Sequence, residues 1–150
     1  MGKLLFSSGK LHQIKGAPES SVRSYLYSIR DNLGHENAHA FPLSYYKYGK
    51  NNTRHFTFQQ TYKTIPVFGR YVRVHISNNT ITSLSSNIDK IYLSIVPIIT
   101  EPEALNIIKQ SNIATSSYLQ YNNLQIYIHN SIPHLVHTVD AVNMEASWRY

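Results

Sequence analysis

The chain has 150 residues, a length sufficient for one ordinary domain or two small lobes, and its formal net charge is +6. It contains no cysteine, which excludes a disulfide framework, a thiol nucleophile and a thiolate zinc site. Its longest aliphatic run, residues 95–99, is interrupted by Pro97, so the sequence predicts no membrane-spanning helix.

The N-terminal region is expected to be a flexible arm followed by one helix. Residues 1–16 are basic and aperiodic, and they hold no apolar run long enough for a signal peptide. From Val22 to Leu33, apolar residues recur at the spacing of one helix face. Pro18 near the first turn and Gly34 just past the end are the usual start and stop signals of a helix.

Alternation of apolar and polar residues predicts that the next segments form an antiparallel meander. The four predicted runs are residues 43–48, 54–63, 71–76 and 81–85, and the period of two holds over the second and the third. Turn sequences separate the first run from the second and the third from the fourth. One face of the second run should hold Phe56, Phe58, Gln60 and Tyr62. The third run should point Val72, Val74 and Ile76 inward, and Tyr71, Arg73 and His75 outward.

The last third of the chain predicts a second lobe. Thr100 and Glu103 form a capping box at the start of a helix, and residues 124–129 and 135–142 alternate as two strands. Charge also divides the chain. Residues 1–90 hold twelve Lys/Arg and four Asp/Glu, a balance of +8, whereas residues 91–150 have a balance of −2. We therefore predict an α+β fold of two lobes, each a helix packed on an antiparallel β-sheet.

The sharpest chemical motif is His35-Glu36-Asn37-Ala38-His39, which has the spacing H-E-x-x-H. On a helix, this spacing places both imidazoles on one face to bind zinc, with the glutamate as general base. Here the motif lies in a stretch without an amphipathic helix pattern, so a polar loop is the favoured interpretation. We expect no metal and no cofactor, and we keep a minimal zinc-dependent peptidase using His35, Glu36 and His39 as an alternative.

A basic nucleic-acid-binding module is the other alternative. Basic residues recur on the predicted strands with aromatic residues between them, namely Arg54, Lys63, Arg70 and Arg73. A solvated strand face is the commoner cause of such a pattern, and the sequence has neither an RNP-like nor a helix-turn-helix signature. We therefore expect neither a nucleic acid nor a membrane as the partner.

Three short motifs follow one another in the first predicted sheet. Residues 59–62 read Gln-Gln-Thr-Tyr, residues 66–69 read Pro-Val-Phe-Gly, and residues 72–75 read Val-Arg-Val-His. In this order and spacing, they resemble the fungalysin/thermolysin propeptide (FTP) domain. The chain departs from the family pattern at Thr64 and at Arg70, where glycine is usual. Further on, residues 100–105 look like the helix start of a PepSY-type lobe.

The resemblance implies a non-catalytic pro-region of a thermolysin-type zinc metallopeptidase, secreted or periplasmic. Such propeptides act as intramolecular chaperones and temporary inhibitors of the cognate protease domain, through protein–protein contact. The implied organisation is a flexible arm over residues 1–16, an FTP-like lobe over 17–90 and a C-terminally truncated PepSY-like lobe over 91–150. Neither an oligomeric state nor an identity for the protease follows from the sequence.

The resemblance also assigns roles to individual residues, none of them catalytic. Six residues should maintain the motif itself: Gln59, Gln60, Tyr62, Pro66, Val67 and Gly69. Of these, the glutamines and the tyrosine should connect the strands, while the proline and the glycine should set the turn. The candidates for contact with the protease domain are the outward-facing Tyr71, Arg73 and His75.

Overall fold

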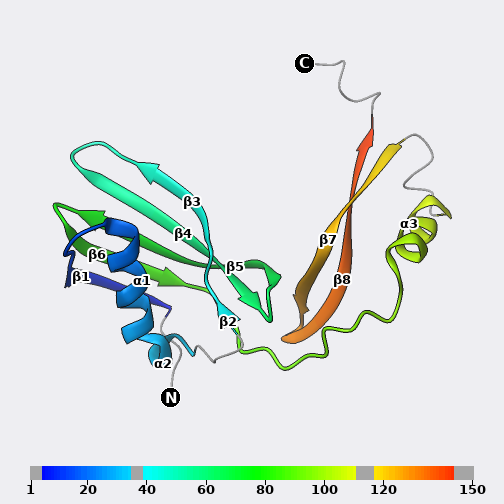
Figure 1. Cartoon of the computed structure of the whole chain (residues 1–150), viewed down its shortest axis with the longest axis horizontal. Helices are drawn as coiled ribbons and strands as arrows, with labels where there is room; N and C mark the ends of the chain where they lie inside the picture. Colours follow the sequence, from blue (N-terminus) through cyan, green and yellow to red (C-terminus); the bar gives the residue numbers. More distant parts are fainter. Residues whose placement is uncertain (1–4, 35–38, 111–116, 144–150) are drawn as a thin grey trace. The chain divides into compact units, whose positions relative to one another are not determined.

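The computed structural model describes residues 5–34, 39–110 and 117–143. The chain divides into two compact units, unit 1 over residues 1–91 and unit 2 over residues 92–150. Unit 1 contains helices α1 and α2 and strands β1 to β6, and unit 2 contains helix α3 and strands β7 and β8 (Figure 1). Each unit is described below by itself.

Unit 1 is built on an antiparallel sheet. Its strands are β1 (Phe6–Gln13), β2 (His39–Ala40), β3 (Leu43–Tyr48), β4 (Thr53–Tyr62), β5 (Ile65–Ser77) and β6 (Thr80–Ser86). The order across the sheet is β1-β6-β5-β4-β2, and β3 also pairs with β4. Strands β2 and β3 pair with different parts of β4 because Pro42 interrupts the run between them. The predicted meander of residues 43–86 is thus present.

Tight two-residue turns connect β4 to β5 and β5 to β6 in this meander. Lys63 and Thr64 join β4 to β5 with φ angles of 47° and 74°, and Asn78 and Asn79 join β5 to β6 with φ angles of 47° and 58°. Two consecutive positive φ angles are typical of a type I′ hairpin turn, whose twist matches that of the strands. Asparagine adopts this conformation at low cost, whereas a β-branched threonine does not. Thr64 therefore holds a strained position.

One face of the unit 1 sheet is covered by helix α1 (Pro18–Ser28), which the short helix α2 (Arg30–Leu33) follows (Figure 1). Val22, Leu26 and Leu33 from these helices join the same hydrophobic core as the inward side chains of the sheet. The sheet side of the core is Phe56, Phe58, Val72, Val74, Ile76, Ile81 and Leu84. Gly34 ends the helical segment in the left-handed conformation, with φ of 70°. The predicted helix and inward faces are confirmed.

Part of the expected flexible arm lies in the sheet instead. Strand β1 pairs antiparallel with β6, with Phe6 opposite Ser85 and Gln13 opposite Thr80. Beyond the strand, the Ile14 amide donates to the Asn79 carbonyl at 2.8 Å. These backbone bonds do not depend on an alternating side-chain pattern. Strand β1 has no such pattern, so it could not be predicted from the sequence.

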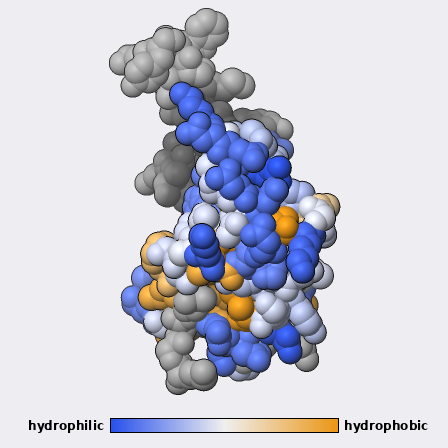
Figure 2. Space-filling view, turned by 90° about the vertical axis from the view of Figure 1, so that its left-hand side faces the viewer, coloured by the Kyte–Doolittle hydropathy of each residue, from blue (hydrophilic) through white to orange (hydrophobic). Residues whose placement is uncertain are grey.

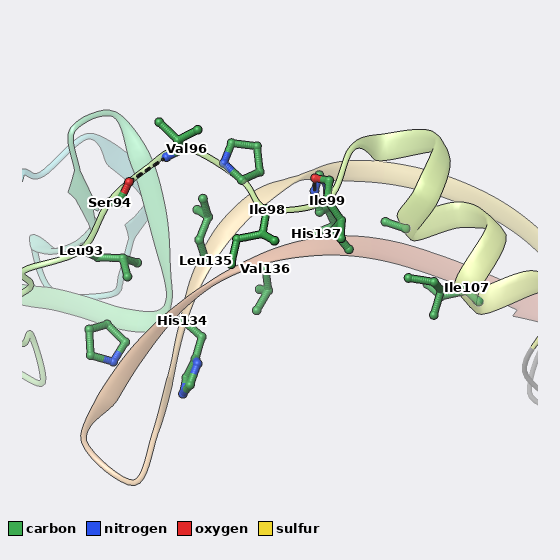
Figure 3. Close-up of a pocket in the computed structure, with 14 residues that line it drawn as sticks. Leu93, Ser94, Val96, Ile98, Ile99, Ile107, His134, Leu135, Val136 and His137 are labelled. Carbon is green, nitrogen blue, oxygen red and sulfur yellow. Dashed lines mark hydrogen bonds between the residues drawn. The ribbon is translucent and has the colours of Figure 1, made fainter.

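Unit 2 consists of helix α3 (Glu101–Gln110) and a long hairpin of β7 (Ser117–His129) and β8 (Ile132–Asn143). The predicted capping box is present, because the Thr100 amide donates to Glu103 Oε2 at 2.7 Å and the Glu103 amide donates to Thr100 Oγ1 at 3.5 Å. Asn130 and Ser131 form the hairpin turn with positive φ angles. Within α3, only Ala104 is buried. Ile107 is 57% exposed, and it lines an open hollow together with residues of segment 93–99 and of β8 (Figure 3).

The predicted fold class is therefore wrong. Strands make up about half of the residues that the structure describes and helices only about a fifth, so the fold is mostly β rather than two helix-on-sheet lobes. The reason is clearest in unit 2, where a two-stranded hairpin offers α3 little surface to bury and the helix leaves most of its apolar residues accessible. No helix in the described part of the chain is long and apolar enough to span a membrane.

Candidate protein-binding surface of unit 1

The face of the unit 1 sheet opposite the core carries the outward-facing candidates. Residues directly opposite each other on paired strands point to the same side of a sheet. The pairings therefore define one surface of strands β3 to β6, which we call the open face. Its residues alternate along the strands with the core residues, and they are Tyr45, Lys47, His55, Thr57, Gln59, Tyr71, Arg73, His75, Ser83 and Ser85. The three predicted contact residues all belong to it.

Two rows of side chains cross the open face from β3 to β6. The first row is Lys47, His55, His75 and Ser83, and the second is Tyr45, Thr57, Arg73 and Ser85. Arg73 is exposed, and its guanidinium lies 5.3 Å from the ring centroid of Tyr71, a distance at which a cation–π contact holds the side chain along β5. Strands β3 to β6 contain no aspartate or glutamate, so every formal charge on the open face is positive.

His55 and His75 face each other in the first row. Their Nδ1 atoms are in hydrogen-bonding contact, and their rings are edge-to-face with centroids 4.6 Å apart. Burial lowers the pKa of His75 from its ordinary value of 6.5, and the neighbouring His55 and Arg73 lower it further. His75 is therefore mainly neutral at pH 7, and one ring donates to the other.

The view in Figure 2 shows a surface dominated by hydrophilic residues, with hydrophobic residues in small separated groups. Large apolar patches are the usual mark of an obligate interface. On unit 1, the exposed aromatic residues of the meander are interspersed with cationic and hydroxyl side chains, as with Tyr45 beside Lys47 in β3. Recognition by such a surface depends on charge and hydrogen bonding together with aromatic contact.

Gln60 lies beneath the open face and is completely buried. Its Nε2 donates to the Asp89 carbonyl at 2.5 Å, and its Oε1 accepts from the Asp89 amide at 3.0 Å. Asp89 also accepts an ion-pairing hydrogen bond from Arg70 at 2.5 Å. These contacts fix the segment after β6 against β4 and β5.

The other residues of the FTP-like motif have separate positions. Gln59 donates from Nε2 to the Val67 carbonyl at 2.9 Å, Tyr62 is 6% exposed and Val67 is fully buried. Pro66 lies within β5 opposite Thr61, so the hairpin turn is at Lys63 and Thr64 rather than at Pro66 and Gly69.

Gly69 has φ of +67° and lies on β5 where the pairing register with β4 shifts. Such a shift is a β-bulge, and glycine adopts its positive φ without strain. The Gly69 carbonyl accepts from Asn87 Nδ2 at 2.7 Å, while Asn87 Oδ1 accepts from the Tyr71 amide at 2.8 Å. Asn87 thus closes the bulge, a role that sequence reasoning did not find.

The possible zinc motif falls largely outside the described residues. His35 and Glu36 are not among them, and His39 is described only by its backbone, as the first residue of β2. Among the residues that the structure does describe, no group of three or more His, Asp or Glu side chains is placed to hold a metal ion.

Comparison with known families matches residues 43–88 to the Fungalysin/Thermolysin Propeptide Motif. The matched residues run from the first residue of β3 to just past the end of β6, so they include every strand of the open face. The match ends before unit 2, and the PepSY-like assignment of residues 91–150 is not confirmed. Residues 43–88 of this chain are therefore a fungalysin/thermolysin propeptide motif, as found in thermolysin-type propeptides, and the motif is the β3–β6 meander.

Proposed function

We propose that this chain is the non-catalytic pro-region of a thermolysin-type zinc metallopeptidase, and that it acts as an intramolecular chaperone and temporary inhibitor of the protease domain. The observation that carries the proposal is the FTP match over residues 43–88. The same residues form a hydrogen-bonded meander with a solvent-accessible face of one charge sign. In this proposal, residues 17–90 are the FTP lobe and residues 91–150 are a PepSY-like lobe.

The physical mechanism is contact without chemistry. A folded sheet surface that binds native-like parts of a slow-folding domain stabilises them and so favours productive folding. If the bound surface remains in place after folding, it blocks substrate access to the active-site cleft. Tyr71, Arg73 and His75 are the proposed contacts, because they lie together on β5 and alternate with the core residues Val72 and Val74.

The charge of the open face indicates the chemistry of its partner. Arg73 and Lys47 are exposed, and no carboxylate lies on β3 to β6 to neutralise them. A complementary surface on the protease domain would be acidic, so association should be fast at low salt and slower as salt screens the charges. Because thermolysin-type proteases with such pro-regions are secreted, we also propose a secreted or periplasmic location.

Refolding a denatured thermolysin-type protease domain in the presence and absence of the purified chain tests this function. The proposal expects recovered peptidase activity to rise in proportion to added chain up to one equivalent, once the inhibitory chain is removed by limited proteolysis. The chain alone should hydrolyse no peptide. Equal recovery with the chain and with an unrelated basic protein would contradict the proposal.

A further inference from the structure

The His55–His75 pair has the geometry of a two-ligand metal site. The two residues are directly opposite on adjacent antiparallel strands, and their Nδ1 atoms point at each other rather than outward. Tetrahedral zinc with two Zn–N bonds of about 2.0–2.1 Å needs ligand nitrogens about 3.3 Å apart. Small rotations of two half-buried rings, already edge-to-face with centroids 4.6 Å apart, provide that separation.

The chemistry of the pair favours a transition metal over a hard cation. Neutral imidazole is a good ligand for Zn²⁺, Cu²⁺ and Ni²⁺, whereas Mg²⁺ and Ca²⁺ require carboxylate or carbonyl oxygens. The strands around the pair supply no carboxylate, and Lys47 lies opposite His55. The nearby positive charge repels a metal ion, so only an ion that forms strong bonds to nitrogen can bind here.

Room for further ligands lies beside the pair. A surface hollow of about 760 Å³ is lined by His55 and His75 together with residues of β3, the β3–β4 turn and the start of β4, namely Tyr45, Lys47, Tyr48, Gly49, Lys50 and Thr53. Water, or a carboxylate from a bound protein, can therefore complete the coordination. The hollow lies entirely within unit 1.

We propose that His55 and His75 bind one divalent transition metal ion through their Nδ1 atoms, with the remaining coordination positions open to this hollow. In the metal-free pair, one Nδ1 carries the hydrogen that the other accepts. On binding, that hydrogen moves through solvent to Nε2 of the same ring, so both Nδ1 lone pairs bind the metal. No net proton is released when both rings are neutral.

The experiment is a calorimetric titration of the whole chain with Zn²⁺ at pH 7.5, together with variants of each histidine group. The proposal expects one ion per chain, with affinity reduced more than about tenfold in His55→Gln and in His75→Gln, since each loses a directly bonded ligand. The matched control is the double variant His35→Gln/His39→Gln, which removes the H-E-x-x-H imidazoles and should leave this binding event unchanged.

Histidine ring resonances of the unmodified chain give a second measurement that does not depend on the folding of a variant. Addition of Zn²⁺ should shift the His55 and His75 ring signals together, with saturation at one equivalent. Binding that is lost in the His35→Gln/His39→Gln variant but kept in His75→Gln would overturn the proposal. The absence of any Zn²⁺ binding, or shifts confined to other histidines, would overturn it equally.

Discussion

Gln60 and Asp89 are joined by two hydrogen bonds although they are 29 residues apart in the chain. The glutamine side chain satisfies both the amide and the carbonyl of Asp89, and Gln60 itself is fully buried. A buried amide is favourable only when its hydrogen bonds are made. The pair therefore fixes the position at which the chain leaves the β3–β6 meander.

Replacement of this glutamine should be one of the most destabilising single changes in the meander. Gln60→Ala removes two hydrogen bonds and leaves a cavity, so we expect a loss of about 2–4 kcal/mol in the free energy of unfolding. Urea denaturation followed by circular dichroism measures it. Gln59→Ala is the matched control, because Gln59 is half-buried and makes one side-chain bond to Val67. An equal loss for both variants would contradict the role given to the Gln60–Asp89 pair.

Thr64→Gly should stabilise unit 1. Thr64 has φ of 74°, a conformation that costs a non-glycine residue roughly 1–2 kcal/mol and costs glycine almost nothing. Part of this gain is offset by the greater freedom of glycine in the unfolded chain, so we expect a net gain of about 0.5–1 kcal/mol. Thermal unfolding would detect it as a higher midpoint. The control is Thr57→Gly, in the middle of β4, which should lower the thermal midpoint. If Thr64→Gly also lowered the midpoint, strain at the turn would be excluded.

Ser86→Ala should be neutral or stabilising. The Ser86 hydroxyl is buried and has no hydrogen-bond partner in the described part of the chain. Burying such a group costs free energy that a methyl group does not. We expect the free energy of unfolding to stay within about 0.5 kcal/mol of the parent or to rise by up to about 1 kcal/mol. A loss above that range in urea denaturation would show that the hydroxyl has a partner.

Acidification should destabilise the protein through His75. The pKa of His75 is lowered in the folded state by burial, by His55 and by Arg73, so the unfolded chain binds a proton more readily than the folded one. As pH falls through the ordinary value of 6.5, stability should decrease until the folded-state pKa is reached. Thermal midpoints measured between pH 8 and pH 5 should fall less steeply in His75→Thr. His134→Thr, on β8, is the comparison, and an unchanged slope in His75→Thr would contradict this linkage.

Sequence periodicity predicted the local structure of the motif well. The inward positions Phe56, Phe58 and Gln60 are buried as expected, and the Thr100–Glu103 capping box is present. These features depend on residues a few positions apart, which a pattern in the sequence records directly.

Features that depend on distant pairing were not predictable from the pattern. The outward position of His75 was expected, but its direct opposition to His55 depends on the β4–β5 register. That register depends on the turn at Lys63 and Thr64, which lacks the glycine or asparagine that usually marks such a turn, and on the register shift near Gly69. Strand β1 depends on its pairing with β6 in the same way. The prediction of the fold class was wrong because helix periodicity does not show whether a sheet lies beside the helix for it to cover.

The decisive experiment is binding of the purified chain to a folded thermolysin-type protease domain. Calorimetry at low and high salt should be performed with the parent chain, with Arg73→Glu on the open face and with Arg30→Glu on α2. Both variants make the same change in net charge. We expect salt-sensitive binding that Arg73→Glu weakens at least about tenfold, as is usual for a charge reversal within an interface, and that Arg30→Glu leaves nearly unchanged. Equal weakening by both variants, or no binding by the parent chain, would contradict it.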